Sequence, residues 1–143
     1  LSLGTLLGVV DSTPQFHLMP PFIRYLSEVA FIQLGDATIT GIPGELYPEI
    51  AVGGIENQKG ADFAIEPQEV PPLRSQLPGK LNLMVNLAND AIGYIIPISE
   101  WDKDAPWIYD ESEETYGEVV SLGPNTAPII HQTVIKLSEE SKP

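Results

Sequence analysis

The sequence predicts an α+β or mixed α/β fold, in which a β-hairpin and further strands combine with short helices and a C-terminal helix. Three observations predict this class. Two β-prone runs flank the pair Gly35-Asp36, Leu or Val occupies every second position of residues 81–87, and a helical apolar stripe follows Thr126. The strands and helices mix without a regular βαβ rhythm.

The size and composition of the chain indicate one globular unit. The chain has 143 residues, 43% of them hydrophobic, which is enough apolar material for the core of one domain. We expect residues 1–143 to form a single unit without a second domain. No apolar run reaches the ~18–20 residues that cross a bilayer, so an integral membrane protein is not expected. The chain has no Cys, which excludes a disulfide scaffold, a thiolate-ligated zinc site and a Cys nucleophile.

The charge of the chain is strongly negative. Seven Lys and Arg residues stand against twenty Asp and Glu residues, for a formal net charge of −13 at pH 7. A chain this acidic repels phosphate backbones and anionic membrane surfaces, so we expect no nucleic-acid partner. The acidity serves either solubility or cation binding, and a solvated acidic face is the commoner case.

The first residues indicate that the chain was cut from a longer polypeptide. The sequence opens at Leu1 with no Met, no basic region and no small-residue cleavage site, so it begins neither as a raw translation start nor as a signal peptide. Residues 1–10 are apolar and resemble core-forming sequence instead.

The first predicted element is a β-hairpin. Residues 29–34 are rich in β-formers, Gly35-Asp36 makes a two-residue turn, and residues 37–42 alternate. Pro43-Gly44 then ends the second strand, because proline cannot continue a ladder and glycine permits a sharp turn. A short helix is predicted at residues 47–52.

The middle of the chain is predicted to contain a long loop, a strand and a short helix. Residues 55–79 carry four prolines among polar residues, which indicates a long excursion over the surface. Residues 81–87 have the period-2 pattern of a strand, with a single longer helix from Lys80 as the alternative. One of the polar residues 89–90 caps a short helix at residues 91–96, which the following proline stops.

The last predicted elements are a short strand and a helix. The strand covers residues 118–121. The helix begins where Thr126 caps it, with Pro128 near its first turn. Its apolar stripe consists of Ile129, Ile130, Val134 and Leu137.

Few residues taken alone point to a functional site. A self-contained zinc enzyme needs about three converging protein ligands, whereas the two histidines, His17 and His131, are expected to be structural. Eight acids between residues 100 and 118 suit a hard cation such as Ca²⁺ but lack the EF-hand order. Glu45 is the best local candidate, because a strand that ends in Pro-Gly delivers the next carboxylate at a rigid sheet edge. The alternative for Glu45 is an exposed turn residue.

Three segments of the chain, taken in order, carry a family resemblance. They are Ile42-Pro43-Gly44-Glu45-Leu46, then Leu87-Ala88-Asn89-Asp90-Ala91-Ile92-Gly93-Tyr94-Ile95, then Tyr116-Gly117-Glu118 followed by Leu122-Gly123-Pro124-Asn125-Thr126. They resemble the Pro-Gly/Ala-Glu metal-ligand motif, the Asn-containing segment ending in Tyr and a β-branched residue, and the Tyr-Glu…Gly-Pro-x-Thr segment of the neutral/alkaline (non-lysosomal) ceramidase family. The likeness covers about residues 29–137 and implies the C-terminal part of the catalytic domain.

The resemblance implies a zinc amidohydrolase that cleaves an N-acyl amide such as ceramide. In that family two histidines from the earlier part of the domain bind zinc together with a glutamate and a tyrosine from the later part. Carried across by motif, these two are Glu45 and Tyr94. The ligand histidines and the catalytic serine would precede Leu1, so the fragment holds no catalytic residue and is not active alone. The implied partners are a lipid-like N-acyl substrate and the rest of the parent domain, and the implied location is secreted or periplasmic.

Two departures from the family pattern leave the substrate open. Glu45 is followed by Leu46-Tyr47-Pro48-Glu49, where the family has Thr residues and paired arginines, and the spacing to Tyr94 is long, 94 − 45 = 49 positions. A different ester or amide substrate is therefore an alternative. A further alternative is a non-catalytic acidic module that binds a cation such as calcium or a protein partner. If the metal-ligand assignment is right, Glu45 and Tyr94 lie close together at the same end of a sheet.

Overall fold

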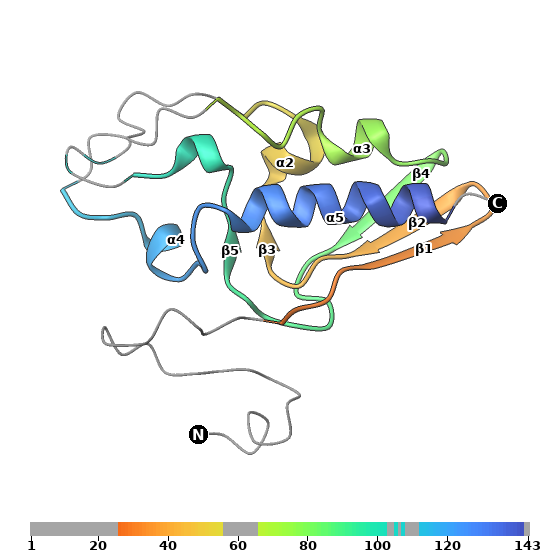
Figure 1. The fold of residues 1–143 in the computed structure, drawn as a ribbon, viewed down its shortest axis with the longest axis horizontal. Coiled ribbons are helices and arrows are strands. Elements are labelled where there is room, and N and C mark those ends of the chain that lie inside the picture. The colour runs from red at the N-terminus through yellow and green to blue at the C-terminus, as the bar shows by residue number, and fades with distance from the viewer. Residues whose placement is uncertain (1–25, 56–65, 103–104, 106, 108–111, 142–143) are drawn as a thin grey trace, which may run out of the picture.

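The computed structural model describes residues 26–55, 66–102, 105, 107 and 112–141. Within them, two small sheets and several short helices pack around one long helix, α5 (Thr126–Glu140), which lies across the strands in Figure 1. This arrangement confirms the predicted α+β class with its C-terminal helix. No helix among these residues is long and apolar enough to cross a membrane.

The larger sheet has three strands in the order β1-β2-β4. The antiparallel hairpin of β1 (Ala30–Leu34) and β2 (Ala37–Gly41) turns at Gly35, whose φ of 59° suits glycine. Strand β4 (Leu81–Val85) pairs with β2 in parallel. The predicted hairpin and the predicted strand after Lys80 are therefore confirmed, and the alternative long helix is wrong.

The outer face of this sheet is apolar, whereas its inner face combines polar side chains with Phe31 and Met84, which pack against the core. Thr38 and Thr40 are fully buried, and the Thr38 hydroxyl donates a hydrogen bond to Oδ1 of Asn82. The neighbouring strands hold large apolar side chains on the exposed face: Ile32, Leu34, Leu81, Leu83 and Val85. The alternation therefore predicted the strands correctly without indicating which face is buried.

The smaller sheet pairs β3 (Glu45–Leu46) with β5 (Tyr94–Ile95) in parallel. After β3 the chain enters α2 (Pro48–Val52), which confirms the predicted short helix. Proline at its first position is favourable, since that position has no intrahelical N–H bond to lose. The long excursion that follows contains α3 (Leu73–Gln76), and its residues 56–65 lie outside the described part of the chain.

One hydrophobic core joins the smaller sheet to the helices. Its buried members come from β3, β5, α2, α3, α5 and the segments beside them: Ile42, Leu46, Ile50, Leu73, Leu77, Ile95, Ala127, Ile130 and Val134. His131 of α5 is also buried, with Nε2 3.0 Å from the carbonyl oxygen of Pro71, so its predicted structural role is confirmed. The other histidine, His17, lies outside the described residues.

Three predicted local features are wrong. Residues 91–96 form no helix, because Gly93 adopts a φ of 90° and the residues after it pair with β3 as β5. Residues 118–121 form no strand, because α4 (Tyr116–Val119) occupies most of this segment and only Ser121 makes an isolated bridge, to Tyr94. Helix α5 is preceded by Asn125 as its capping position, and Thr126 is already its first residue.

A short 3₁₀-helix, η1 (Ile98–Glu100), follows β5.

Gly93 is expected to be the glycine least tolerant of substitution, with Gly54 as its matched control. Both have φ near 90–100°, but a Cβ at Gly93 would lie 1.8 Å from the carbonyl oxygen of Val120, whereas nothing lies within 4 Å at Gly54. Gly54→Ala is expected to cost only the backbone strain, ~1–2 kcal/mol, and Gly93→Ala more than ~3 kcal/mol, because the backbone must also move. Urea unfolding of both variants measures the difference, and equal losses would contradict the close approach.

Candidate functional site

The structure brings together the two residues that the sequence motifs single out. Glu45 and Tyr94 are direct register partners in the parallel pair β3–β5. Register partners on neighbouring strands lie about 4.8 Å apart and project their side chains from the same face. Both residues are partly buried. A carboxylate and a phenol that are far apart in the sequence thus lie side by side at one end of the same sheet.

Gly44 allows the backbones of β3 and β5 to approach each other. The N–H of Glu45 donates to the carbonyl oxygen of Gly93 at 2.9 Å, and the N–H of Ile92 donates to that of Pro43 at 2.9 Å. A Cβ at Gly44 would lie 2.4 Å from the Gly93 oxygen, so only glycine fits there without a backbone shift. The Pro-Gly turn predicted to end the preceding strand therefore also sets the register of the site.

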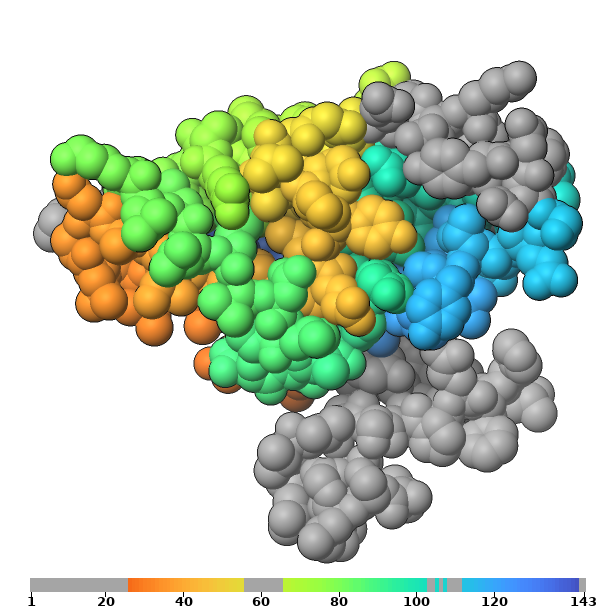
Figure 2. Space-filling view, turned by 180° about the vertical axis from the view of Figure 1, so that it is seen from behind, coloured from red at the N-terminus to blue at the C-terminus, as the bar shows by residue number. Residues whose placement is uncertain are grey.

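The alternation along β3 and β5 separates the site from the core. Leu46 and Ile95 are buried against α5. Glu45 and Tyr94, one residue away on each strand, project from the opposite face. Figure 2 views the molecule from behind and shows the segments of β3, β5 and α4 meeting at the surface there.

The Tyr94 ring lies between two other tyrosine rings. Its centroid is 6.1 Å from that of Tyr47 and 6.0 Å from that of Tyr116, with interplanar angles of 80° and 74°. Both contacts are edge-to-face, the arrangement that the charge distribution of aromatic rings favours. Neither Tyr47 nor Tyr116 was predicted from the sequence to be a site residue. Tyr47 could have been predicted from its spacing, because it follows Glu45 by two residues and so lies on the same side of an extended chain.

The donor set at this position fits part of a zinc site. Zinc in proteins is usually four-coordinate and accepts carboxylate oxygen; a phenol is a less usual ligand. Glu45 and Tyr94 supply two oxygen donors, and the described residues contain no group of three or more His, Cys, Asp or Glu side chains placed to hold a metal. His131 packs in the core between Pro71 and Gln76. A complete zinc site here would need ligands from outside the described residues.

The acids between residues 100 and 118 do not gather into a cation site where the structure describes them. Glu113 and Glu114 are exposed, whereas three others are buried: Glu100, Asp102 and Glu118. Three more, Asp104, Asp110 and Glu111, fall outside the described residues. The N–H of Asp102 donates to Oε1 of Glu118 at 3.2 Å. Burial raises the pKa of Glu118 to about 7, and this hydrogen bond only partly opposes the shift.

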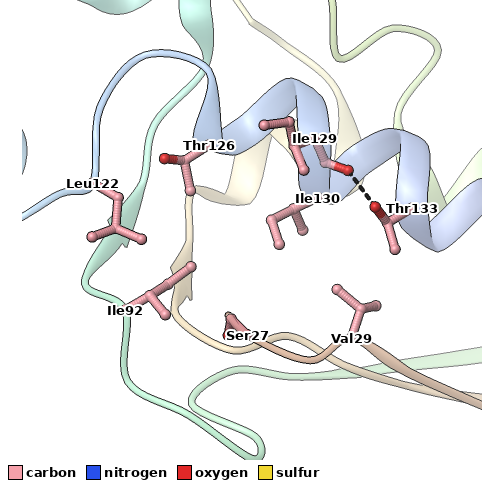
Figure 3. Close-up of a pocket in the computed structure, with 8 residues that line it drawn as sticks. All are labelled: Ser27, Val29, Ile92, Leu122, Thr126, Ile129, Ile130 and Thr133. Carbon is pink, nitrogen blue, oxygen red and sulfur yellow. Dashed lines mark hydrogen bonds between the residues drawn. The ribbon is translucent and has the colours of Figure 1, made fainter. Parts of the chain in front are cut away.

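An apolar pocket of about 220 Å³ lies under α5 (Figure 3). Side chains of α5 face Val29 and Ile92 across it, and the Thr133 hydroxyl is turned back to the carbonyl oxygen of Ile129 at 2.7 Å. Among the described residues that line it, none is titratable and neither Glu45 nor Tyr94 takes part.

Comparisons of the chain with models of known families, with curated proteins and with solved structures give no match. The candidate site is thus defined by features of the chain itself. These are the register pair of Glu45 and Tyr94, the glycine at position 44 that allows it, and the tyrosine rings around Tyr94.

The raised pKa of Glu118 predicts a pH-dependent stability. Below about pH 4.5 the carboxyl is protonated in the folded and the unfolded chain, so its burial then costs least. As the pH rises toward 7, the unfolded state loses its proton first, so the free energy of unfolding falls. Glu118→Gln should remove this component and be more stable than the wild type above pH 7 by ~2 kcal/mol.

Urea unfolding at pH 5 and pH 8 measures this effect, with Glu113→Gln as the exposed control. The wild type should lose more stability between the two pH values than Glu118→Gln does, while Glu113→Gln should follow the wild type. Parallel pH dependences of Glu118→Gln and the wild type would show that the Glu118 carboxyl titrates as an ordinary surface group.

Proposed function

We propose that this chain is the C-terminal portion of a ceramidase-like zinc amidohydrolase domain, which hydrolyses an N-acyl amide such as ceramide. Glu45 and Tyr94 supply two of the zinc ligands, and the rest of the parent domain supplies the others. The observation that carries the proposal is the register pairing of these two residues. The motifs select them from separate segments of the sequence, and the fold then places them side by side.

The residues of this chain would hold the zinc ion and orient the reacting groups, and would not themselves attack the amide bond. A zinc ion bound at this position would polarise a water molecule or the scissile carbonyl group near neutral pH. Glu45 would bind the ion through its carboxylate and offset part of its charge. Tyr94 would bind through its phenol oxygen, or donate a hydrogen bond to the oxyanion that develops on the carbonyl oxygen. Backbone hydrogen bonds join β3 to β5, and the buried residue on each strand packs in the core. Together these contacts keep the carboxylate and the phenol at a fixed separation, which a metal site requires.

The outer face of the larger sheet supports the part of the proposal that places the chain in a larger domain. Parallel pairing, as between β2 and β4, is typical of sheets covered on both faces. Here α5 covers one face only, and the apolar side chains of the other face are about half exposed or more. A further layer from the parent domain would bury them.

We expect the isolated chain to bind Zn²⁺ weakly, with a dissociation constant above ~1 µM, because two oxygen ligands make an incomplete site. Removing either ligand, by Glu45→Gln or Tyr94→Phe, should weaken binding further, by about tenfold or more. Isothermal titration calorimetry measures both quantities, with Glu113→Gln as a control that changes the same charge on an exposed acid.

The same titration separates the proposal from the acidic-module alternative. Calcium binding that exceeds zinc binding, and that Glu45→Gln leaves unchanged, would favour the acidic module. Sub-micromolar zinc affinity in the isolated chain would contradict the half-site.

For the parent protein, we expect hydrolysis of N-acyl sphingosine that requires zinc and is lost in Glu45→Gln. The substitution keeps the size of the side chain and removes the charge that binds the metal, so kcat/KM should fall by at least ~100-fold. Release of the free fatty acid from N-acyl sphingosine and from simpler amides measures the activity and its substrate range. Cleavage of simple amides alone would replace the ceramide assignment by another amide substrate, and an unchanged rate in Glu45→Gln would contradict the metal role.

A further inference from the structure

The orientation of the Tyr94 phenol is not set by its own strand. Strand β5 has only two residues, and the tyrosine side chain has two rotatable bonds, so the backbone alone leaves several positions open to the hydroxyl. The two rings of Tyr47 and Tyr116 close on the Tyr94 ring from different elements, one just after β3 and one at the start of α4. These two contacts limit the positions open to the Tyr94 ring.

A steric contact connects Tyr47 to α4. A Cβ at Gly117 would lie 2.6 Å from the Tyr47 hydroxyl oxygen, 3.7 Å from its Cζ and 3.3 Å from Cδ1 of Ile96. Gly117 is buried, so the Tyr47 hydroxyl occupies the space that any larger residue at this position would take. Tyr116 directly precedes Gly117 in α4, so this close approach lies beside the ring pair of Tyr116 and Tyr94.

We propose that Tyr47 and Tyr116 are positioning residues that orient the Tyr94 phenol beside Glu45, and that Gly117 is the residue whose small size allows this packing. The packing is a property of the described structure, whereas its consequence for metal binding rests on the function proposed above. A metal ligand must be held within about 0.5 Å of its productive position. The two flanking rings supply this restraint for Tyr94, and the register with β3 supplies it for Glu45.

The test uses the full chain with two readouts, the NMR signals of the Tyr94 ring and the zinc affinity. The Tyr94 signals are assigned by their loss in Tyr94→Phe. In Tyr47→Leu and in Tyr116→Leu, the Tyr94 ring signals should shift, because a neighbouring ring current is lost, and zinc affinity should fall by about three- to tenfold. In the Tyr94→Phe background neither substitution should lower zinc affinity further. A general loss of folding would lower it in that background as well.

Gly117 gives the sharper test, because the structure predicts a rescue. Gly117→Ala should displace the Tyr47 ring, shift the Tyr94 signals and weaken zinc binding. Tyr47→Phe keeps the ring and removes the oxygen that the new methyl group would meet, which leaves Cζ at 3.7 Å. The effect of Gly117→Ala on both readouts should therefore be much smaller in the Tyr47→Phe background.

The outcomes separate the positioning role from the proposed function. If Tyr94→Phe does not change zinc affinity, the metal role of Tyr94 fails, and the ring signals alone decide whether Tyr47 and Tyr116 orient it. If Tyr47→Leu and Tyr116→Leu leave the Tyr94 signals unchanged, or if the Gly117→Ala effect is equally large with and without the Tyr47 hydroxyl, the positioning role is overturned.

Discussion

The parallel pairing of β3 with β5 is the contact on which the candidate site depends. It is short, and backbone hydrogen bonds such as that from the Glu45 N–H to the Gly93 oxygen hold it together. Gly44 makes the approach sterically possible, and Leu46 and Ile95 anchor the opposite face in the core. The same backbone arrangement therefore buries one pair of residues and presents the other pair, a carboxylate and a phenol, together.

This pairing brings a carboxylate and a phenol to neighbouring positions. Two further tyrosine rings pack on that of Tyr94, and the described residues contain no group of three or more His, Cys, Asp or Glu side chains placed to hold a metal. The negative charge of the chain does not collect at one metal position in these residues. Some of it is exposed, and some is buried with carboxyl groups such as Glu118, whose raised pKa reflects the cost of burying a charge. The proposed half-site would use the neighbouring positions of Glu45 and Tyr94, whereas a purely solvating role for the acids would not.

The larger sheet has an outer face whose apolar side chains are exposed among the described residues. Its buried face holds threonines that need hydrogen-bond partners, such as Thr38 with Asn82, and its exposed face holds isoleucine, leucine and valine side chains. Apolar surface of this kind normally marks a contact with another part of the protein or with a partner. A chain that belongs inside a larger domain would have such a face.

The sequence by itself determined those elements that depend on interactions between residues close together in the chain. The Gly35 turn, the alternating strands, the proline-led α2 and the helix α5 follow from backbone preferences and periodicity, and motif resemblance selected Glu45 and Tyr94. The apolar stripe predicted for α5 is only partly right, because Ile129 is exposed. Only the tertiary structure decided that residues 94–95 form a strand, since two residues pair only if a partner strand lies beside them. It also decided which sheet face is buried and that Tyr47, Tyr116 and Gly117 meet at Tyr94. Those outcomes depend on contacts between segments distant in the sequence, which no local pattern specifies.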